Sequence, residues 1–308
     1  MNNDTSAGPA LGKVVVGVDG SDHARTAVLW AAAEADRRGR PLIVVHAADT
    51  DGRALYASVA TIERARETGH DLLVTTAALV EERFPDLRVT KVFSRREPVG
   101  SLLEAAGDDG TIVVGNRGLG GFGALMLGSV GLGVSARAKV PVVVVRGEHD
   151  RPRLGTVIAA VRGEKDLDWA RYAAREAQVR EASLRLLTVW SALTQVGGRA
   201  AMLDDIDEVA HELVHSTVEL ADRLRDEFPG LDVTTEVVGG HSVAGRLVEA
   251  SRDAELYVVG GRRRPIGIGP ALGRVTHALL HHAHCPLLVV PADGFPRAAG
   301  TGSEGEER

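Results

Sequence analysis

The chain has 308 residues, of which 44% are hydrophobic and 25% are charged, and its formal net charge is −6. This length predicts about two domains, each able to bury its own core, and the composition excludes a disordered chain. The negative charge disfavours a nucleic-acid surface, and the single cysteine, Cys285, excludes an internal disulfide. Because no long apolar run or signal-like segment is evident, we expect a cytoplasmic protein with no membrane or nucleic-acid partner.

The first half of the chain alternates β-branched runs with helical patterns, which predicts βαβ units and a parallel sheet covered on both faces. The first helix is expected near residues 23–39, where alanines precede a glycine, and the second near residues 58–83. Four helices in all would fill the gaps between five strands. These strands are expected near residues 13–18, 41–47, 87–93, 111–115 and 141–146.

A glycine-rich segment follows the fourth expected strand. Gly115 and Gly118 come directly after Val113-Val114, and Gly128-Ser129-Val130 opens an apolar helical pattern. Glycine lets the backbone approach an anion closely, and the N–H groups at the start of a helix donate hydrogen bonds at the positive end of its dipole. The segment therefore predicts a phosphate cradle.

The chain repeats itself. Residues 84–90 (FPDLRVT) return as residues 228–234 (FPGLDVT), an offset of 144 residues with five of seven positions identical. A period this long indicates a duplicated domain rather than a solenoid. We expect domain 1 at residues 11–147, domain 2 at residues 153–292, and flexible tails at residues 1–10 and 293–308.

The segment Val14-Val15-Val16-Gly17-Val18-Asp19-Gly20-Ser21, the glycine spacing and residues 141–145 together resemble the universal stress protein family. The resemblance covers roughly residues 12–292. It implies two Rossmann-like (adenine nucleotide alpha hydrolase-like) α/β domains, each with a five-stranded parallel sheet of order 3-2-1-4-5 and helices on both faces. A ligand would then lie at the topological switch point, beside the ends of strands one and four.

The resemblance also implies how the domains and chains associate. The two domains would pack as an intramolecular pseudo-dimer, with their final strands, near residues 142–145 and 287–290, meeting at their edges. Such pairing protects exposed strand edges. Two chains would then associate further as a homodimer.

Carried onto this sequence, the resemblance implies that domain 1 binds ATP, with Mg²⁺ arriving on the nucleotide. Asp19 and the backbone near Gly17 and Ala47 would hold the adenosine. The expected phosphate-binding residues are Gly115, Asn116, Arg117, Gly118, Leu119, Gly120, Gly128, Ser129 and Val130. For Arg117, a phosphate contact and a surface position are both open, and Asp19 could also be only a turn residue. We assign no catalytic and no metal-ligating residue.

Domain 2 departs from this pattern. Aligning the repeats places Arg162 at the Asp19 position, Arg263 at Gly118 and Arg274 at Ser129. An arginine fills the space that a backbone–phosphate contact needs, and its side chain accepts no hydrogen bond. We therefore expect no ATP in domain 2. Two interpretations of the arginines stay open: structural or solvent-facing side chains, or a different anion site.

Two glycine motifs compete with the phosphate cradle. Residues 118–123 match GxGxxG, but they follow the fourth strand, and no Asp or Glu lies between Gly123 and Glu148. The context of a dinucleotide fingerprint is therefore missing. Residues 123–129 imitate GxxxxGKS without the lysine that contacts phosphate in Walker-type NTPases.

The second half holds two motifs that could suggest other chemistry. Ser242, in a segment that loosely matches a nucleophile elbow, is expected to cap a helix. A histidine-rich segment resembles a metal site but fits the C-terminus of the last helix, where imidazoles are favoured. Its members are His277, His281, His282, His284 and Cys285.

The predicted function is an ATP-binding regulatory module of a stress response, whose conformation is read by an unidentified signalling partner. Two alternatives stay open, namely a slow ATP hydrolase and a nucleotide-free interaction protein. No pair of residues resembles a general base and a water-positioning group, so the sequence does not predict an ATPase.

Overall fold

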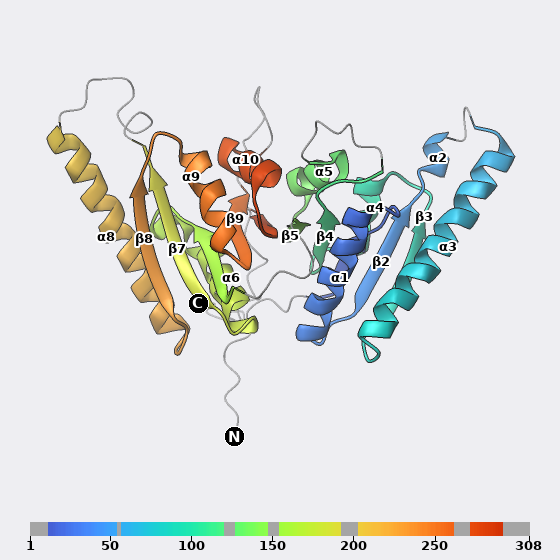
Figure 1. The fold of residues 1–308 in the computed structure, drawn as a ribbon, viewed down its shortest axis with the longest axis horizontal. Helices are drawn as coiled ribbons and strands as arrows, with labels where there is room; N and C mark the ends of the chain where they lie inside the picture. The colour runs from blue at the N-terminus through green and yellow to red at the C-terminus, as the bar shows by residue number, and fades with distance from the viewer. Residues whose placement is uncertain are drawn as a thin grey trace, which may run out of the picture.

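The computed structural model describes residues 12–53, 57–119, 127–146, 154–191, 203–261 and 272–291. In its first half, strands alternate with helices (Figure 1). The strands are β1 Val14–Gly17, β2 Leu42–Ala47, β3 Val89–Ser94, β4 Thr111–Gly115 and β5 Val142–Val145. The helices are α1 Asp22–Arg37, α2 Thr50–Arg53, α3 Val59–Arg83, α4 Pro98–Ala106 and α5 Ser129–Arg137. The five predicted strands are thus confirmed, and the short helix α2 is an addition.

The second half repeats this order. Its strands are β6 Thr156–Ala160, β7 Ser183–Trp190, β8 Val233–Gly239, β9 Leu256–Gly261 and β10 Leu287–Pro291. Its helices are α6 Leu167–Val179, α8 Leu203–Glu227, α9 Val243–Ala250 and α10 Arg274–His282. None of the described helices is long and apolar enough to cross a membrane.

The ten strands of the described residues join one sheet, in the order β3-β2-β1-β4-β5-β10-β9-β6-β7-β8. Each half therefore has the predicted order 3-2-1-4-5, and its strands run parallel. The halves meet through β5 and β10, which pair antiparallel with Val144 opposite Leu287 and Val142 opposite Val289. The predicted meeting of the final strands is confirmed, and it covers one edge of each half-sheet.

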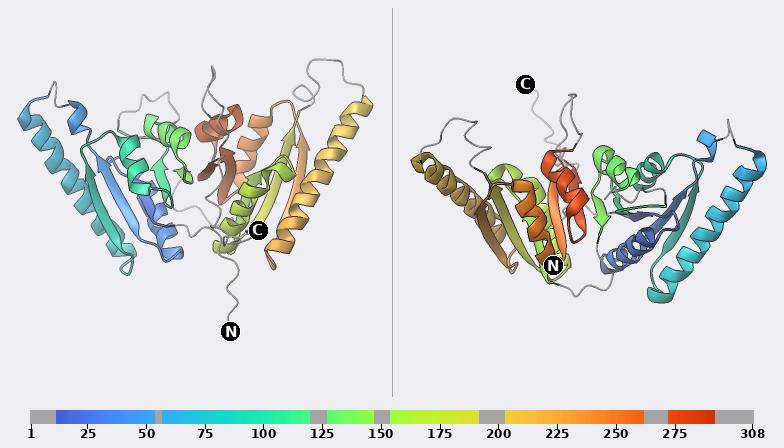
Figure 2. Two further views of the ribbon diagram at one scale, coloured as in Figure 1. Left: turned by 180° about the vertical axis from the view of Figure 1, so that it is seen from behind. Right: turned by 45° about the horizontal axis from the view of Figure 1, so that its top comes forward.

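Two apolar cores fill the space between the sheet and its helices, and each core spans both halves. One face is covered by α1, α3, α6 and α8, and the other by α4, α5, α9 and α10 (Figure 2). Strands buried on both faces explain the nearly continuous valine runs of the sequence. On α1, small side chains such as Ala27, Ala31 and Ala35 are fully buried, so this helix packs closely on the sheet.

A buried ion-pair network joins α1 to α6 across the two halves. It contains Glu34, Arg38, Glu176 and Arg180, and we call it the Glu–Arg ring. The Arg38 Nη2 atom donates to both carboxylate oxygens of Glu176 at 2.7 Å, and Arg180 Nη2 donates to Glu34 Oε2 at 2.8 Å. Within each half, Arg38 also pairs with Glu34, and Arg180 with Glu176. The glutamate of each repeat thus binds the arginine of the other repeat. The same contact is made in both directions, as in an isologous interface.

The charges of the ring depend on one another. The side chains of Glu34 and Arg180 are each 2% exposed. Burial raises the pKa of the Glu34 carboxyl, but Arg180, Arg38 and Arg37 outweigh it and hold this pKa at about 2, below the ordinary 4.5. The guanidinium of Arg180 also lies 5.9 Å from the centroid of the Trp30 ring, within the range of a cation–π contact. Each charge is therefore paired where water is excluded.

Candidate functional site

Asp19 lies just beyond the end of β1, between the ends of β2 and β4. Its Oδ1 atom accepts hydrogen bonds from the Ser21 backbone N–H at 3.0 Å and from the Ser21 hydroxyl at 2.7 Å. Its Oδ2 atom accepts one from the backbone N–H of Leu119 at 2.9 Å. The carboxylate therefore makes a local turn and also binds the loop after β4. This is the topological switch point of the first half, because β1 pairs with both β2 and β4.

Ser21 begins the helix that follows. Its side chain accepts a hydrogen bond from the Ala24 backbone N–H at 3.2 Å, so Ser21 is the N-cap of α1. Gly20 has a φ of +90°, a conformation that glycine adopts without strain. The Asp-Gly-Ser segment therefore combines a tight turn, a cap and an acidic group at the sheet edge.

Two glycines of the loop after β4 face protein atoms closely. A Cβ atom at Gly118 would lie 2.3 Å from Asp19 Oδ2, and one at Gly115 would lie 2.7 Å from the carbonyl oxygen of His23. Both distances are too short for a side chain. These positions thus need glycine to bring the loop against Asp19 and against the first turn of α1, a reason that does not involve a ligand.

The start of α5 offers backbone donors near this loop. The N–H of Gly128 donates to the carbonyl of Asn116 at 2.8 Å, and Gly128 supplies no side-chain cap to the helix. The first turn of a helix has no intrahelical acceptors for its N–H groups, which here belong to Ser129, Val130 and Gly131. The backbone N–H groups that could bind a phosphate at this helix therefore begin at Ser129, because the N–H of Gly128 is already hydrogen-bonded.

The other predicted residues lie around this centre. Gly17 ends β1, where a Cβ atom would lie 3.2 Å from Leu102, and Ala47 ends the neighbouring β2. Leu119 is 73% exposed. Gly120 lies outside the described residues.

Arg117 acts on a charged group at the junction of the two halves. Burial lowers the pKa of Arg146, which follows β5, and the positive charge of Arg117 lowers it further. The Nε atom of Arg117 is buried and has no hydrogen-bond acceptor among the described residues. The positive charge of Arg117 therefore acts on the end of β5.

The matching position of the second half is occupied by protein side chains. Arg162 stands where Asp19 stands in the first half, and its Nε and Nη2 atoms donate to the Asp166 carboxylate at 3.0 and 2.6 Å. Asp166 is 4% exposed. At the end of β9, a Cβ atom on Gly260 would lie 2.9 Å from Nε1 of Trp169, so this indole ring covers the strand end. Arg162 is therefore held in an ion pair with Asp166, which agrees with the structural interpretation of this residue.

Other residues singled out in the second half lie at the ends of its helices. Arg274 is the first residue of α10 and is exposed, whereas Arg263 lies outside the described residues. Ser242 caps α9 by accepting a hydrogen bond from the Gly245 N–H at 3.1 Å, as predicted. His281 and His282 lie in the last turn of α10, also as predicted. No group of three His, Cys, Asp or Glu side chains suited to a metal ion occurs within the described ranges.

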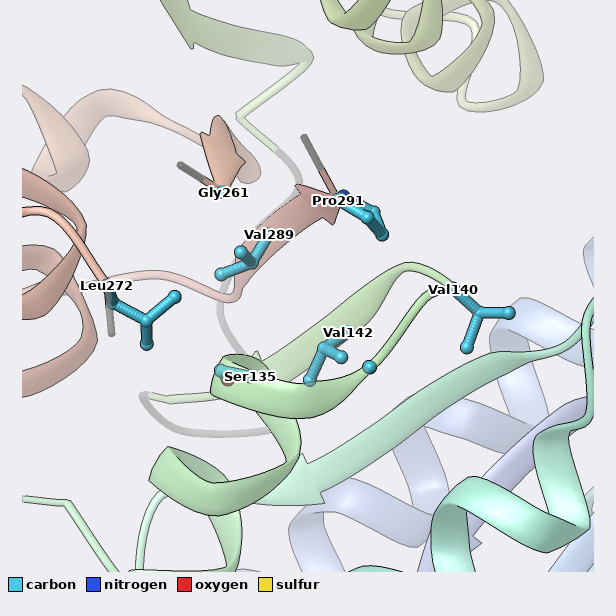
Figure 3. A pocket seen from close by; sticks show the side chains of 8 residues that line it. Ser135, Val140, Val142, Gly261, Leu272, Val289 and Pro291 are labelled. Carbon is cyan, nitrogen blue, oxygen red and sulfur yellow. The ribbon is translucent and has the colours of Figure 1, made fainter. Parts of the chain in front are cut away.

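A pocket lies away from Asp19, at the junction of the two halves (Figure 3). It is a small hollow that opens to solvent. Its lining is almost entirely apolar, and the hydroxyl of Ser135 has no described hydrogen-bond partner. The lining residues are Ser135, Ala138, Val140, Val142, Gly261, Leu272, Val289 and Pro291.

Three features escaped the sequence analysis. The Glu–Arg ring has a signal, because Glu-Ala-x-x-Arg occurs at residues 34–38 and again at residues 176–180, an offset of 142. Trp169 and Asp166 could also be found in the sequence, because both lie in the segment that aligns with the start of the first helix of domain 1. The hydrogen bond from the Leu119 N–H to Asp19 has none, because a backbone donor can belong to any residue type.

Comparison with known proteins agrees with this architecture. The model of the universal stress protein family matches residues 11–146 and again residues 155–291. The chain is 30% identical over 299 residues to universal stress protein Rv2623 of Mycobacterium tuberculosis, covering 92% of this chain and 98% of the relative. It is 29% identical over 289 residues to Rv2005c of the same organism, covering 90% of this chain and 96% of the relative.

Among solved structures, a universal stress protein from Archaeoglobus fulgidus has the same fold. Its TM-score is 0.61 at 14% sequence identity, and the match covers 91% of this chain and 98% of that one. Because the family model matches both halves and nearly the whole described structure, the chain belongs to the universal stress protein family and carries its domain twice.

Proposed function

We propose that this protein is an ATP-binding regulatory module, in which domain 1 (residues 11–147) holds the nucleotide and domain 2 (residues 153–292) does not. The observation that carries the proposal is the difference between the two switch points. In domain 1, the Asp19 carboxylate stands beside Gly118 and binds the backbone N–H of Leu119. In domain 2, an Arg162–Asp166 ion pair and the Trp169 ring occupy the matching space.

The residues of domain 1 fit the two ends of an adenine nucleotide. A carboxylate accepts about four hydrogen bonds, and the three donors to Asp19 leave capacity for a ribose hydroxyl or an adenine amino group. The backbone at Gly17 and Ala47 would flank the adenosine. The first-turn N–H groups of α5 and the helix dipole would face the phosphates. Bound Mg²⁺ would neutralise part of the phosphate charge.

The output of such a site is a change in conformation. The bond between Asp19 and the Leu119 N–H ties the loop after β4 to the end of β1. A nucleotide that binds Asp19 and the first-turn N–H groups of α5 together contacts both ends of this loop, so it favours the loop arrangement that presents both sets of groups. Such a differential interaction is what allows a ligand to shift a conformational equilibrium. A partner that contacts this loop would then distinguish the two states.

The proposal is tested by titrating ATP into the full chain, freed of nucleotide by unfolding and refolding, in a calorimeter. We expect saturable binding near one ATP per chain. A Gly118→Arg variant places a long side chain against Asp19 and should reduce ATP affinity by more than about 100-fold, or about 2.7 kcal/mol.

The matched control is Gly273→Arg. Gly273 is the N-cap of α10 in domain 2, and a Cβ atom there meets no described atom within 4 Å. This variant should bind ATP like the original chain. Absence of ATP binding by a correctly folded chain, or equal affinity in Gly118→Arg, would overturn the proposal.

A further inference from the structure

The backbone just before Asp19 is held by the neighbouring strand β2. Val18 lies between the end of β1 and Asp19. Its N–H donates to the carbonyl of Val45 at 2.9 Å, and its carbonyl accepts a hydrogen bond from Nδ1 of His46 at 2.8 Å. A carbonyl oxygen can only accept, so Nδ1 of His46 carries the proton. Both polar groups of the Val18 main chain are therefore bound by residues of β2.

The bond to the Val18 carbonyl acts directly on Asp19. This carbonyl belongs to the peptide unit that ends at the Cα atom of Asp19, and the unit is planar. A hydrogen bond that fixes this plane therefore also limits the direction in which the Asp19 side chain leaves the backbone. From there the carboxylate reaches the N–H groups of Ser21 and Leu119, at 3.0 and 2.9 Å. The imidazole of His46 thus orients the acid of the candidate site through the main chain.

The same bond stands where a regular sheet would have a backbone bond. The N–H groups of Leu42 and Ala48 donate to carbonyls on the β3 side. Because alternate residues of a parallel strand bond to opposite neighbours, the N–H of Ala47 faces the β1 side. A continued ladder would join it to the Val18 carbonyl, but no such backbone bond occurs among the described residues. The N–H of Ala47 is thus left for a ligand at the end of β2.

Packing holds the ring of His46 in this orientation. The helix α3 covers β2 and β3 (Figure 1), and Gly69 is the residue of α3 that faces the ring. A Cβ atom at Gly69 would lie 2.6 Å from Cδ2 of His46 and 2.6 Å from Cε2 of Phe93, so both rings pack against the helix backbone. Glycine weakens the interior of a helix, and here it admits these two rings. The space for the imidazole therefore depends on this glycine.

Domain 2 makes the same bond with a different residue. Val161, which precedes Arg162, donates its N–H to the carbonyl of Leu187 at 2.9 Å. Its carbonyl accepts a hydrogen bond from the hydroxyl of Thr188 at 3.1 Å. Thr188 is the counterpart of His46, since each directly follows the residue whose carbonyl accepts in this pairing. Two unlike side chains make one bond, which indicates that this point of the fold requires the bond itself.

We propose that His46 is a positioning residue of the nucleotide site, which fixes the Val18 carbonyl, orients the Asp19 carboxylate and leaves the Ala47 N–H to the adenine ring. Adenine carries ring nitrogens that accept and an amino group that donates, so it suits a donor and an acceptor placed side by side. The role in ATP binding rests on the proposed function, whereas the orientation of Asp19 does not. In domain 2 the equivalent bond precedes Arg162, so its loss should not affect ATP.

The first test compares ATP affinities by calorimetry in the full chain. His46→Leu removes the donor and should weaken ATP binding about tenfold, the effect of losing one hydrogen bond. His46→Asn is the conservative variant, because its amide nitrogen can take the place of Nδ1, and it should bind ATP like the original chain. Thr188→Val is the matched control, since it removes the equivalent bond of domain 2, and it should leave ATP affinity unchanged.

The second test needs no nucleotide. NMR measures how fast the amide protons of Ser21 and Leu119, which both donate to Asp19, exchange with water. His46→Leu should speed this exchange about tenfold, because the carboxylate is no longer held toward these donors. His46→Asn and Thr188→Val should leave the exchange unchanged. Urea unfolding of each variant shows whether a general loss of stability accompanies these local effects.

The two tests separate this inference from the proposed function. Unchanged exchange in His46→Leu would overturn the inference, and so would an equal loss of ATP affinity in Thr188→Val or in His46→Asn. If ATP binds the original chain and His46→Leu equally well, the proposed function stands and the inference fails. If the exchange rates follow the expectation but the original chain binds no ATP, the proposed function fails and the orientation of Asp19 by His46 stands.

Discussion

The two repeats are most alike where they touch each other and least alike where domain 1 has its candidate ligand site. Glu34 and Arg38 recur as Glu176 and Arg180 in the Glu–Arg ring, and β5 pairs with its own counterpart β10. At the switch points, in contrast, the carboxylate of Asp19 is replaced by Arg162. The interface and the site are therefore separate parts of the fold, and one can change while the other is kept.

The largest expected effect comes from the shared interface. Arg180→Met should lower the free energy of unfolding by about 3 to 5 kcal/mol, because two buried carboxylates lose a common cation. Urea unfolding measures this. Arg246→Met, which removes an exposed pair with Glu249 on α9, should cost less than about 1 kcal/mol. Similar losses in the two variants would show that the ring does not hold the repeats together.

The second effect is acid sensitivity of the same ring. Because the folded chain holds the pKa of Glu34 at about 2, below the ordinary 4.5, its contribution is complete above pH 4.5 and is lost as the pH falls toward 2. The loss should reach about 3 kcal/mol. Urea unfolding near pH 6 and near pH 3 measures how much the free energy of unfolding falls between these two pH values. We expect a smaller fall for Glu34→Gln than for the original chain. An identical decrease in both would contradict the assignment.

The third effect is the loss of stability when alanine replaces either of two equivalent glycines at the switch points. In Gly115→Ala the new methyl group meets the backbone carbonyl of His23, so the first turn of α1 must move, and we expect a loss of about 2 kcal/mol. In Gly260→Ala it meets the side chain of Trp169, which can adjust, and the loss should be about 1 kcal/mol. Thermal unfolding compares the two, and the reverse order would contradict this account.

The smallest effect concerns ligand binding. Asp19→Asn replaces one acceptor oxygen by a donor and should weaken ATP binding about tenfold, or about 1.4 kcal/mol. Arg162→Ala at the equivalent position of domain 2 should leave ATP affinity unchanged. The exposed Asp36→Asn controls for the loss of one negative charge on α1. If Arg162→Ala weakened binding as much as Asp19→Asn, the assignment of ATP to domain 1 would be wrong.

The sheet could be predicted because its determinants are local. Valine runs such as residues 14–16 and 142–145 are buried on both faces, and the strand order follows from the family that these runs and the glycines resemble. Asp19 could be placed at the sheet edge for the same reason. The hydrogen bond that holds it to Leu119 could not, because it joins residues 100 positions apart through a backbone group.

The Glu–Arg ring was missed for a different physical reason. Charged residues on a helix normally face water, so Glu34 and Arg38 fit the pattern of a solvated surface when α1 is considered alone. Their burial arises only when α1 meets α6 of the other repeat. Likewise, Trp169 is an ordinary apolar residue in the sequence, and only the folded chain places it over Gly260.

The Glu–Arg ring also has a consequence for the order of the two repeats along the chain. Each repeat carries both an acid and a base, and each of these bonds to the other repeat, so either repeat presents the full complement of groups that its partner requires. The interface chemistry is therefore indifferent to which repeat comes first along the chain. Exchanging the order of the repeats, or cutting the polypeptide between them, would leave every contact of the ring available.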